Sequence, residues 1–193
     1  LYKLLGDVHR RNADYIRSQD AYEAALKMGY STSDLHRNLG VALERLNRTQ
    51  SAEKHLKLAL EMNPDDAFAL NYLGYWWADQ GRNLDEAIAL IRRAVQLRPS
   101  SGYFVDSLGW VHFRLGDAEK AVQFLEQATE LTPADSEITG HLGDVYWYLG
   151  RYDEARFKWR LAKSLSVEQK EKNKFSSRIN SGLPSSETNS LPQ

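Results

Sequence analysis

The chain has 193 residues with 25 basic and 26 acidic side chains, which gives a formal net charge of −1. Nucleic acid is therefore not an expected partner, because binding to a phosphate backbone usually requires a basic face. The absence of cysteine excludes disulfides and cysteine-based zinc sites, and no apolar run approaches the roughly 18 residues that direct membrane insertion requires.

A Leu-Gly pattern recurs five times along the chain at an almost constant interval. Its glycines are Gly6, Gly40, Gly74, Gly109 and Gly143, which are 34, 34, 35 and 34 residues apart. A period of this size predicts stacked supersecondary units that contact only their neighbours. We expect five units over residues 1–166, with bounds near 1–31, 32–65, 66–100, 101–134 and 135–166. The chain opens inside a predicted helix, so we expect the first unit to be truncated.

Each unit is predicted to contain two helices. In residues 32–65, apolar residues recur three and four apart on both sides of Asn47, which indicates one helix before this residue and one after it. Later units carry glycine at the register of Asn47, where a helix ends in a left-handed residue: Gly81, Gly116 and Gly150. The repeat glycines fall mid-helix and large side chains recur in the second helices, which predicts close large-on-small packing.

The end of the chain differs from the repeats. Residues 167–182 are mostly polar and keep Phe175 and Ile179 as apolar contacts four residues apart, which predicts a terminal capping helix. Residues 183–193 are mostly polar and contain three serines, and we expect them to be disordered.

The repeated residues resemble the tetratricopeptide repeat. The fourth unit shows the full pattern, which consists of Leu108-Gly109, His112, Ala121, Leu125, Ala128 and Pro133. The first unit departs from it at Ser18 and Tyr30, and the third has one additional residue near 82–84. The resemblance implies an all-α, right-handed superhelical solenoid whose first helices line a concave groove.

The resemblance also implies which positions line the groove: three before, one after, four after and five after each glycine. In the first two units these positions are mostly charged: Lys3, Asp7, Arg10, Arg11, Arg37, Val41, Glu44 and Arg45. In the later units many are aromatic: Asn71, Tyr75, Asp79, Asp106, Trp110, Phe113, Arg114, Asp144, Trp147 and Tyr148, flanked by Phe68 and Tyr103. We expect a protein or peptide partner to contact Arg37, Asn71, Tyr75, Asp106, Trp110, Phe113, Arg114, Trp147 and Tyr148.

Aromatic residues at helical spacing also serve as core. The register of Trp76, Trp77, Tyr146 and Trp159 coincides with buried positions of the family, so we expect these four in the core. Tyr75, Trp110, Phe113 and Trp147 are expected to be exposed in the groove, and the alternative is packing against a neighbouring unit or against an absent upstream segment.

Two other kinds of site are not expected. Chaperone-binding members of the family hold a peptide carboxylate with lysine and asparagine; Lys3 occupies one such position, but Asp7 and Val41 replace the asparagines. The histidines show no metal-ligand spacing, and the sequence has no phosphate loop or nucleophile elbow. We therefore predict a non-enzymatic adaptor without metal or cofactor.

A narrower resemblance concerns residues 71–75, 106–110 and 141–144. They are similar to the carboxyl-terminal repeats of bacterial envelope tetratricopeptide proteins, which include outer-membrane lipoproteins that recruit carboxyl-terminal processing proteases. This implies an envelope adaptor for a protease or an assembly partner, in the periplasm and anchored by a lipid on an N-terminal segment. The alternative is a cytoplasmic scaffold that assembles with itself.

Overall fold

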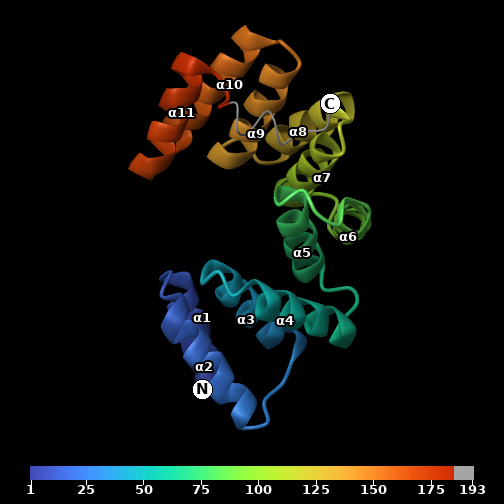
Figure 1. The fold of residues 1–193 in the computed structure, drawn as a ribbon, viewed down its shortest axis with the longest axis vertical. Helices are drawn as coiled ribbons and strands as arrows, with labels where there is room; N and C mark the ends of the chain where they lie inside the picture. Colours follow the sequence, from blue (N-terminus) through green and yellow to red (C-terminus); the bar gives the residue numbers. More distant parts are fainter. Residues whose placement is uncertain (185–193) are drawn as a thin grey trace. The chain divides into compact units, whose positions relative to one another are not determined.

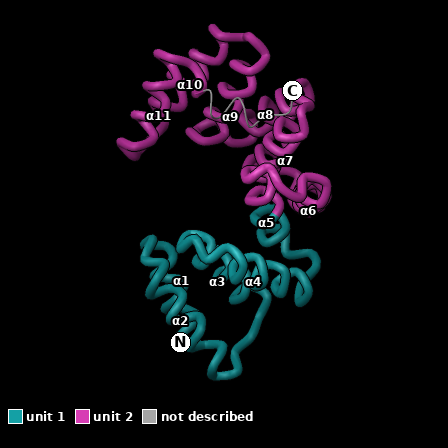
Figure 2. Tube along the Cα trace, in the orientation of Figure 1, with its two compact units in different colours: residues 1–73 teal, residues 74–193 magenta. Residues whose placement is uncertain are grey.

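The computed structural model describes residues 1–184, and Figure 2 divides the chain into two compact units. The first unit comprises residues 1–73 and the second begins at Gly74, so the boundary lies within one helix. Most of the tail that we expect to be disordered, residues 185–193, lies outside the described range.

Residues 1–184 form helices and no strands, so the predicted all-α class is confirmed (Figure 1). The helices are α1 (Tyr2–Arg11), α2 (Tyr15–Lys27), α3 (Ser33–Arg45), α4 (Thr49–Met62), α5 (Ala67–Asp79), α6 (Leu84–Leu97), α7 (Gly102–Arg114), α8 (Ala118–Leu131), α9 (Ser136–Tyr148), α10 (Tyr152–Leu165) and α11 (Gln169–Ser181). None of these helices is long and apolar enough to cross a membrane.

Left-handed residues separate the helices of each pair, as the sequence predicts. Asn47 has φ 58°, and Gly81, Gly116 and Gly150 have φ between 65° and 87°. The additional residue of the third repeat is accommodated by a second left-handed residue, Asn83 with φ 48°, directly before α6. The insertion therefore changes the turn and leaves both neighbouring helices regular.

The mid-helix glycines lie where two helices approach most closely. A Cβ atom added to Gly40 would lie 2.8 Å from the Leu56 side chain, and one added to Gly143 would lie 2.6 Å from the Trp159 indole. Both distances are shorter than an ordinary van der Waals contact. The predicted packing of a large side chain in the second helix against glycine in the first is thus confirmed.

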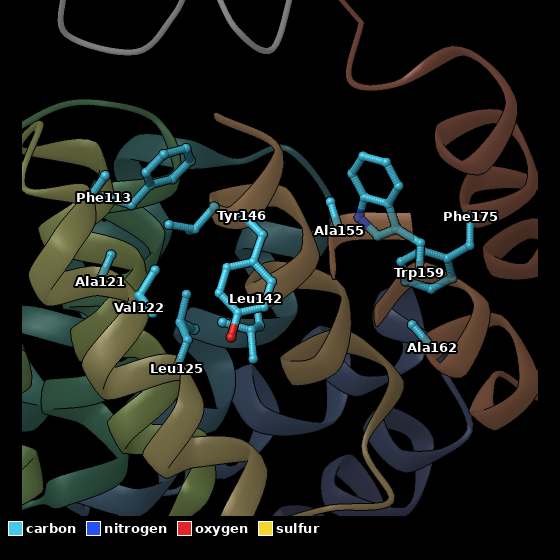
Figure 3. Close-up of a cluster of buried hydrophobic side chains, with 12 residues drawn as sticks. Phe113, Ala121, Val122, Leu125, Leu142, Tyr146, Ala155, Trp159, Ala162 and Phe175 are labelled. Atoms are coloured by element: carbon cyan, nitrogen blue, oxygen red, sulfur yellow. The ribbon is translucent and has the colours of Figure 1, made fainter. Parts of the chain in front are cut away.

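The core of the second compact unit continues to the last helix. A buried cluster contains Val122 of α8, Leu142 of α9, Trp159 of α10 and Phe175 of α11 (Figure 3). The Phe175 ring packs on Gly140, where an added Cβ atom would lie 2.6 Å from the ring. Helix α11 thus lies in the range predicted for a terminal helix and buries Phe175 as expected.

Candidate partner-binding surface

Exposure around the first helix of each pair depends on the angle from the repeat glycine. At about 100° per residue, the position four after the glycine lies only about 40° from the glycine face. This face packs against the second helix, and Phe113 at this position is only 2 % exposed. The position five after the glycine lies about 140° away, and it is exposed at Arg11, Arg45, Asp79 and Tyr148. The expectation that Phe113 is exposed is therefore wrong.

Trp147 packs partly against the core of α10. Its ring lies 5.3 Å from Trp159 and 4.5 Å from Tyr152, measured between centroids. The Arg156 guanidinium lies 5.2 Å from the same indole, and Gly182, just after α11, approaches the indole so closely that it leaves no room for a Cβ atom. Trp147 is therefore half-buried, as Tyr75 and Trp110 are, and the segment after α11 covers part of its ring.

Asp106 is buried as well, which corrects its assignment to the groove surface. Its Oδ1 atom lies 2.9 Å from Nδ1 of His141, and both side chains are buried. Burial lowers the pKa of His141, but the Asp106 carboxylate outweighs this effect, and the pKa rises to about 9. His141 is thus an imidazolium at neutral pH, buried against its counterion.

Sequence reasoning missed His141 as a member of the candidate site. One signal was present in the repeat register, because Asn38 stands at the same position in the second repeat, two residues before the glycine. Asn38 donates a 2.9 Å hydrogen bond to Asp7 on α1, just as His141 on α9 pairs with Asp106 on α7. A polar residue at this position therefore connects first helices of adjacent repeats.

Four rings form what we call the aromatic surface: Tyr75, Trp110, His141 and Tyr148. Trp110 stacks on His141 with 4.4 Å between ring centroids and 23° between planes, and the Tyr75 ring lies 6.3 Å from His141. Phe113 connects Trp110 to Tyr148, with centroid distances of 5.5 Å and 5.2 Å. Tyr75 and Trp110 are half-buried and Tyr148 is exposed, so all three retain accessible surface.

Two charged groove positions of the first compact unit, Lys3 and Arg37, are paired within the protein. Lys3 lies 2.7 Å from Asp34 and 3.1 Å from Asp7, and its hydrogen bond to Asp34 is the largest contribution that raises its pKa. Arg37 forms a 2.5 Å ion pair with Asp66. With Lys3 and Arg37 both committed to carboxylates, this surface is poorly suited to hold a peptide carboxylate.

The other two predicted contact residues are half-buried. Asn71 lies in the part of α5 that belongs to the first compact unit. Arg114 lies on α7 in the second unit, where its Nη2 atom would be 2.7 Å from a Cβ atom on Gly81. Within residues 1–184, no three histidine or carboxylate side chains form a group that could hold a metal ion.

Comparison with known proteins identifies the family. A family model described as "Tetratricopeptide repeat" matches residues 3–67 and 45–102, which together cover half of the chain. The chain belongs to the tetratricopeptide repeat family. A second model, described as "Anaphase-promoting complex, cyclosome, subunit 3", matches residues 79–157.

Curated relatives of this tetratricopeptide repeat chain are much longer than the matched span. The TPR repeat-containing protein PA4667 of Pseudomonas aeruginosa is 34% identical over 123 residues, which are 62% of this chain and 21% of the relative. The BBSome complex member BBS4 of Bos taurus is 31% identical over 104 residues, 53% of this chain and 19% of the relative. The chain thus spans about a fifth of the length of these relatives.

Solved structures support the fold. TTC0263, a thermophilic TPR protein of Thermus thermophilus, matches with a TM-score of 0.80 at 21% identity, covering 93% of this chain and 97% of that one. The pilF protein of Pseudomonas aeruginosa matches with a TM-score of 0.75 at 20% identity, over 92% and 81% of the two chains. At these identities the similarity extends to the fold alone.

Proposed function

We propose that the chain is a non-enzymatic adaptor that binds a protein or peptide partner through the aromatic surface. Tetratricopeptide repeat proteins generally bind protein partners. The observation that carries the proposal is the stack of Trp110 on the buried His141–Asp106 pair, with Tyr75 and Tyr148 beside it. Aromatic side chains are favoured as binding hot spots because they offer large contact areas at low entropic cost.

Trp110 of the aromatic surface is packed between other rings of the chain. Trp110 is fixed from one side by His141 and from another by Phe113, which is buried. A rigid anchor loses little conformational entropy on binding, so more of its contact energy contributes to affinity. The surface is therefore suited to apolar side chains of an extended segment or of a partner surface.

A capture experiment with matched variants tests the proposal. The purified chain is immobilised and exposed to extract from the source cells, alongside Tyr75→Ala, Tyr148→Ala and the control Phe157→Ala. Phe157 is 61 % exposed on α10 and lies outside the aromatic surface. A partner retained by the unchanged chain and by Phe157→Ala, but lost with both tyrosine variants, supports the proposal.

The affinity of the recovered partner then gives a quantitative criterion. Each tyrosine variant should weaken binding at least tenfold, which corresponds to about 1.4 kcal/mol, while circular dichroism should show unchanged helix content. Equal affinity of all four proteins would contradict the assignment of the aromatic surface.

We also propose a location in the bacterial envelope, with a processing protease or an assembly factor as the partner class. The support is the resemblance of residues 71–75, 106–110 and 141–144 to envelope repeats, and the curated relative from Pseudomonas aeruginosa favours a bacterial source. Fractionation of cells with an antibody against this chain tests the location. Recovery in the cytoplasm alone would favour the alternative, a self-assembling cytoplasmic scaffold.

A further inference from the structure

Helix α10 carries two large apolar side chains on the side that faces away from the core. Ala155, Trp159 and Ala162 place the other side of this helix in the buried cluster (Figure 3). At about 100° per residue, Phe157 and Leu161 each lie about 160° from Trp159, on the opposite side of the helix. They are 61 % and 37 % exposed. The packing of the repeats therefore does not account for these two side chains.

Earlier repeats carry small or polar residues at the position of Phe157. Two residues before the large buried side chain of the second helix, the exposed residues are Asp20, Lys54, Ala89 and Gln123. A large apolar side chain that stays in water gains no hydrophobic stabilisation. With Leu161 one turn later, Phe157 thus forms an apolar pair that only a contact outside the chain would bury.

Basic side chains lie on both sides of this apolar pair. Lys158 and Arg160 each lie about 100° from Trp159, one on either side. Neither forms an ion pair within residues 1–184. The aliphatic stems of such side chains cover apolar surface while their charged groups reach outward. We call Phe157, Lys158, Arg160 and Leu161 the outer face of α10.

Positive charge continues from this face onto the neighbouring helix. Residues 158–174 contain six basic and two acidic side chains, although the whole chain has a net charge of −1. Helix α11 packs on α10 (Figure 1). Three of its lysines are exposed or half-buried: Lys170, Lys172 and Lys174. The acidic residues of α10 lie in its first turn, where Glu154 is paired with Arg151.

We propose that the outer face of α10 binds the anionic surface of a lipid bilayer. Basic side chains are attracted to anionic headgroups, and an apolar pair beside them enters the boundary between headgroups and acyl chains. A bilayer accepts projecting side chains without a preformed pocket, whereas a protein partner would need a cavity for the Phe157 ring. Nucleic acid would be attracted by the same charges, but its phosphates offer no contact to Leu161. The binding is peripheral and does not depend on the aromatic surface.

Flotation with lipid vesicles tests the proposal. The purified chain is mixed with vesicles of phosphatidylcholine alone, or of phosphatidylcholine and phosphatidylglycerol in equal amounts. We expect at least about tenfold tighter binding to the mixed vesicles at low salt, and a loss of this preference as salt screens the charges. No binding to the mixed vesicles, or equal binding to both kinds, would overturn the proposal.

Two substitutions separate the apolar contribution from the electrostatic one. Phe157→Ser and Arg160→Glu should each weaken binding to the mixed vesicles about fivefold or more. Circular dichroism should show unchanged helix content, because both side chains are exposed. Binding that Phe157→Ser leaves unchanged would show attraction by charge alone, which contradicts the proposal.

A charge reversal elsewhere is the control for Arg160→Glu. Lys54→Glu changes the net charge by the same amount at an exposed position of α4. It should bind the mixed vesicles like the unchanged chain. Equal weakening by both reversals would show an effect of net charge alone and would also overturn the proposal.

A fluorescent label reports whether the outer face of α10 enters the bilayer. The chain has no cysteine, so Phe157→Cys carries a single environment-sensitive fluorophore. Its emission should shift to the blue when mixed vesicles are added. The same label on Gln123→Cys, at the equivalent exposed position of the preceding repeat, should show no shift. Equal shifts at the two positions, or no shift at Phe157→Cys, would rule out the proposed contact.

The vesicle experiment also distinguishes this surface from the aromatic surface. Tyr75→Ala and Tyr148→Ala should bind the mixed vesicles like the unchanged chain, although we expect them to lose the protein partner. Loss of vesicle binding in both tyrosine variants would assign the lipid contact to the aromatic surface and would overturn the proposal for α10.

Discussion

Arg178 of α11 and Asp144 of α9 form a buried ion pair, with 2.8 Å between Nη1 and Oδ2. The other oxygen of the carboxylate, Oδ1, accepts a 2.8 Å hydrogen bond from the Trp159 indole on α10. Burial raises the pKa of Asp144, while Arg178 acts in the opposite direction. One carboxylate thus connects three helices, and it fastens the terminal helix in addition to the packing of Phe175.

Arg178→Met should therefore destabilise the chain strongly. The substitution leaves the Asp144 carboxylate buried without its ion-pair partner, and breaking a buried pair in this way typically costs about 3–5 kcal/mol. Urea unfolding followed by circular dichroism measures the loss. The matched control is Lys174→Met on the same helix, because the Lys174–Glu171 pair is solvent-exposed and should contribute less than about 1 kcal/mol. Equal losses from the two variants would rule out the role given to Arg178.

The local features of the fold were predictable because they recur at a fixed interval. Helices, left-handed turn residues and close glycine contacts depend on residues within one repeat, so the periodicity of the sequence predicts them. The Asp144–Arg178 and Asp106–His141 pairs join residues about one repeat apart along the chain. A helical wheel for a single helix places such polar residues on its outer side and does not include the next helix that buries them.

Part of the candidate site was predictable because the exposure of its residues depends on their position within one repeat. The positions one and five after the glycine keep Tyr75, Trp110 and Tyr148 accessible, because they point away from the glycine face. The position four after the glycine points back toward that face, which buries Phe113. The cover over Trp147 comes from the segment after α11, which the repeat pattern does not include.

The stability contributed by His141 should depend on pH in the alkaline range. Its folded pKa of about 9 lies above the unfolded value of about 6.5. The contribution is therefore fully present below about pH 6.5 and is lost as the pH rises through about 9. Nuclear magnetic resonance titration of the His141 ring should give a midpoint near 9, and His141→Gln should flatten this part of the stability profile. A midpoint near 6.5 would contradict the ion pair with Asp106.

The stacked pair of His36 and His55 should also make stability depend on pH, but with the opposite sign and in the acid range. Their Nδ1 atoms are 2.8 Å apart, so one neutral ring donates a hydrogen bond to the other. Burial lowers the pKa of both, and for His55 the charge of His36 adds to this effect. A lowered folded pKa means that stability is present above about pH 6.5 and is lost as the pH falls below it, because the unfolded chain binds more protons.

Thermal melts of the chain between pH 7.5 and 5 test this expectation. The melting temperature should fall toward pH 5 in the unchanged chain and should fall less in His55→Gln, which keeps a hydrogen-bonding side chain without a titrating ring. Parallel profiles for the chain and for His55→Gln would show that the pair has no such effect.

Gly74→Ala should destabilise the chain although alanine is the better helix former. Alanine in a helix interior is favoured over glycine by about 1 kcal/mol. At Gly74, however, the added Cβ atom would lie 2.9 Å from the carbonyl oxygen of Ala87 and 2.7 Å from Cγ1 of Ile91. Overpacking of this kind typically costs about 1–3 kcal/mol, so we expect a net loss of up to about 2 kcal/mol in urea unfolding.

A second substitution separates the two contacts of Gly74. Ile91→Val in the Gly74→Ala background shortens the neighbouring side chain, but the Ala87 carbonyl belongs to the backbone of α6 and cannot rotate away. The double variant should therefore recover less than the full loss, after correction for the cost of Ile91→Val alone. Ala89→Gly, at an exposed position of α6, provides the propensity reference and should cost about 1 kcal/mol. If Gly74→Ala instead stabilises the chain by the amount that Ala89→Gly loses, helix propensity outweighs the contact, and α5 does not approach α6 as closely as the structure shows.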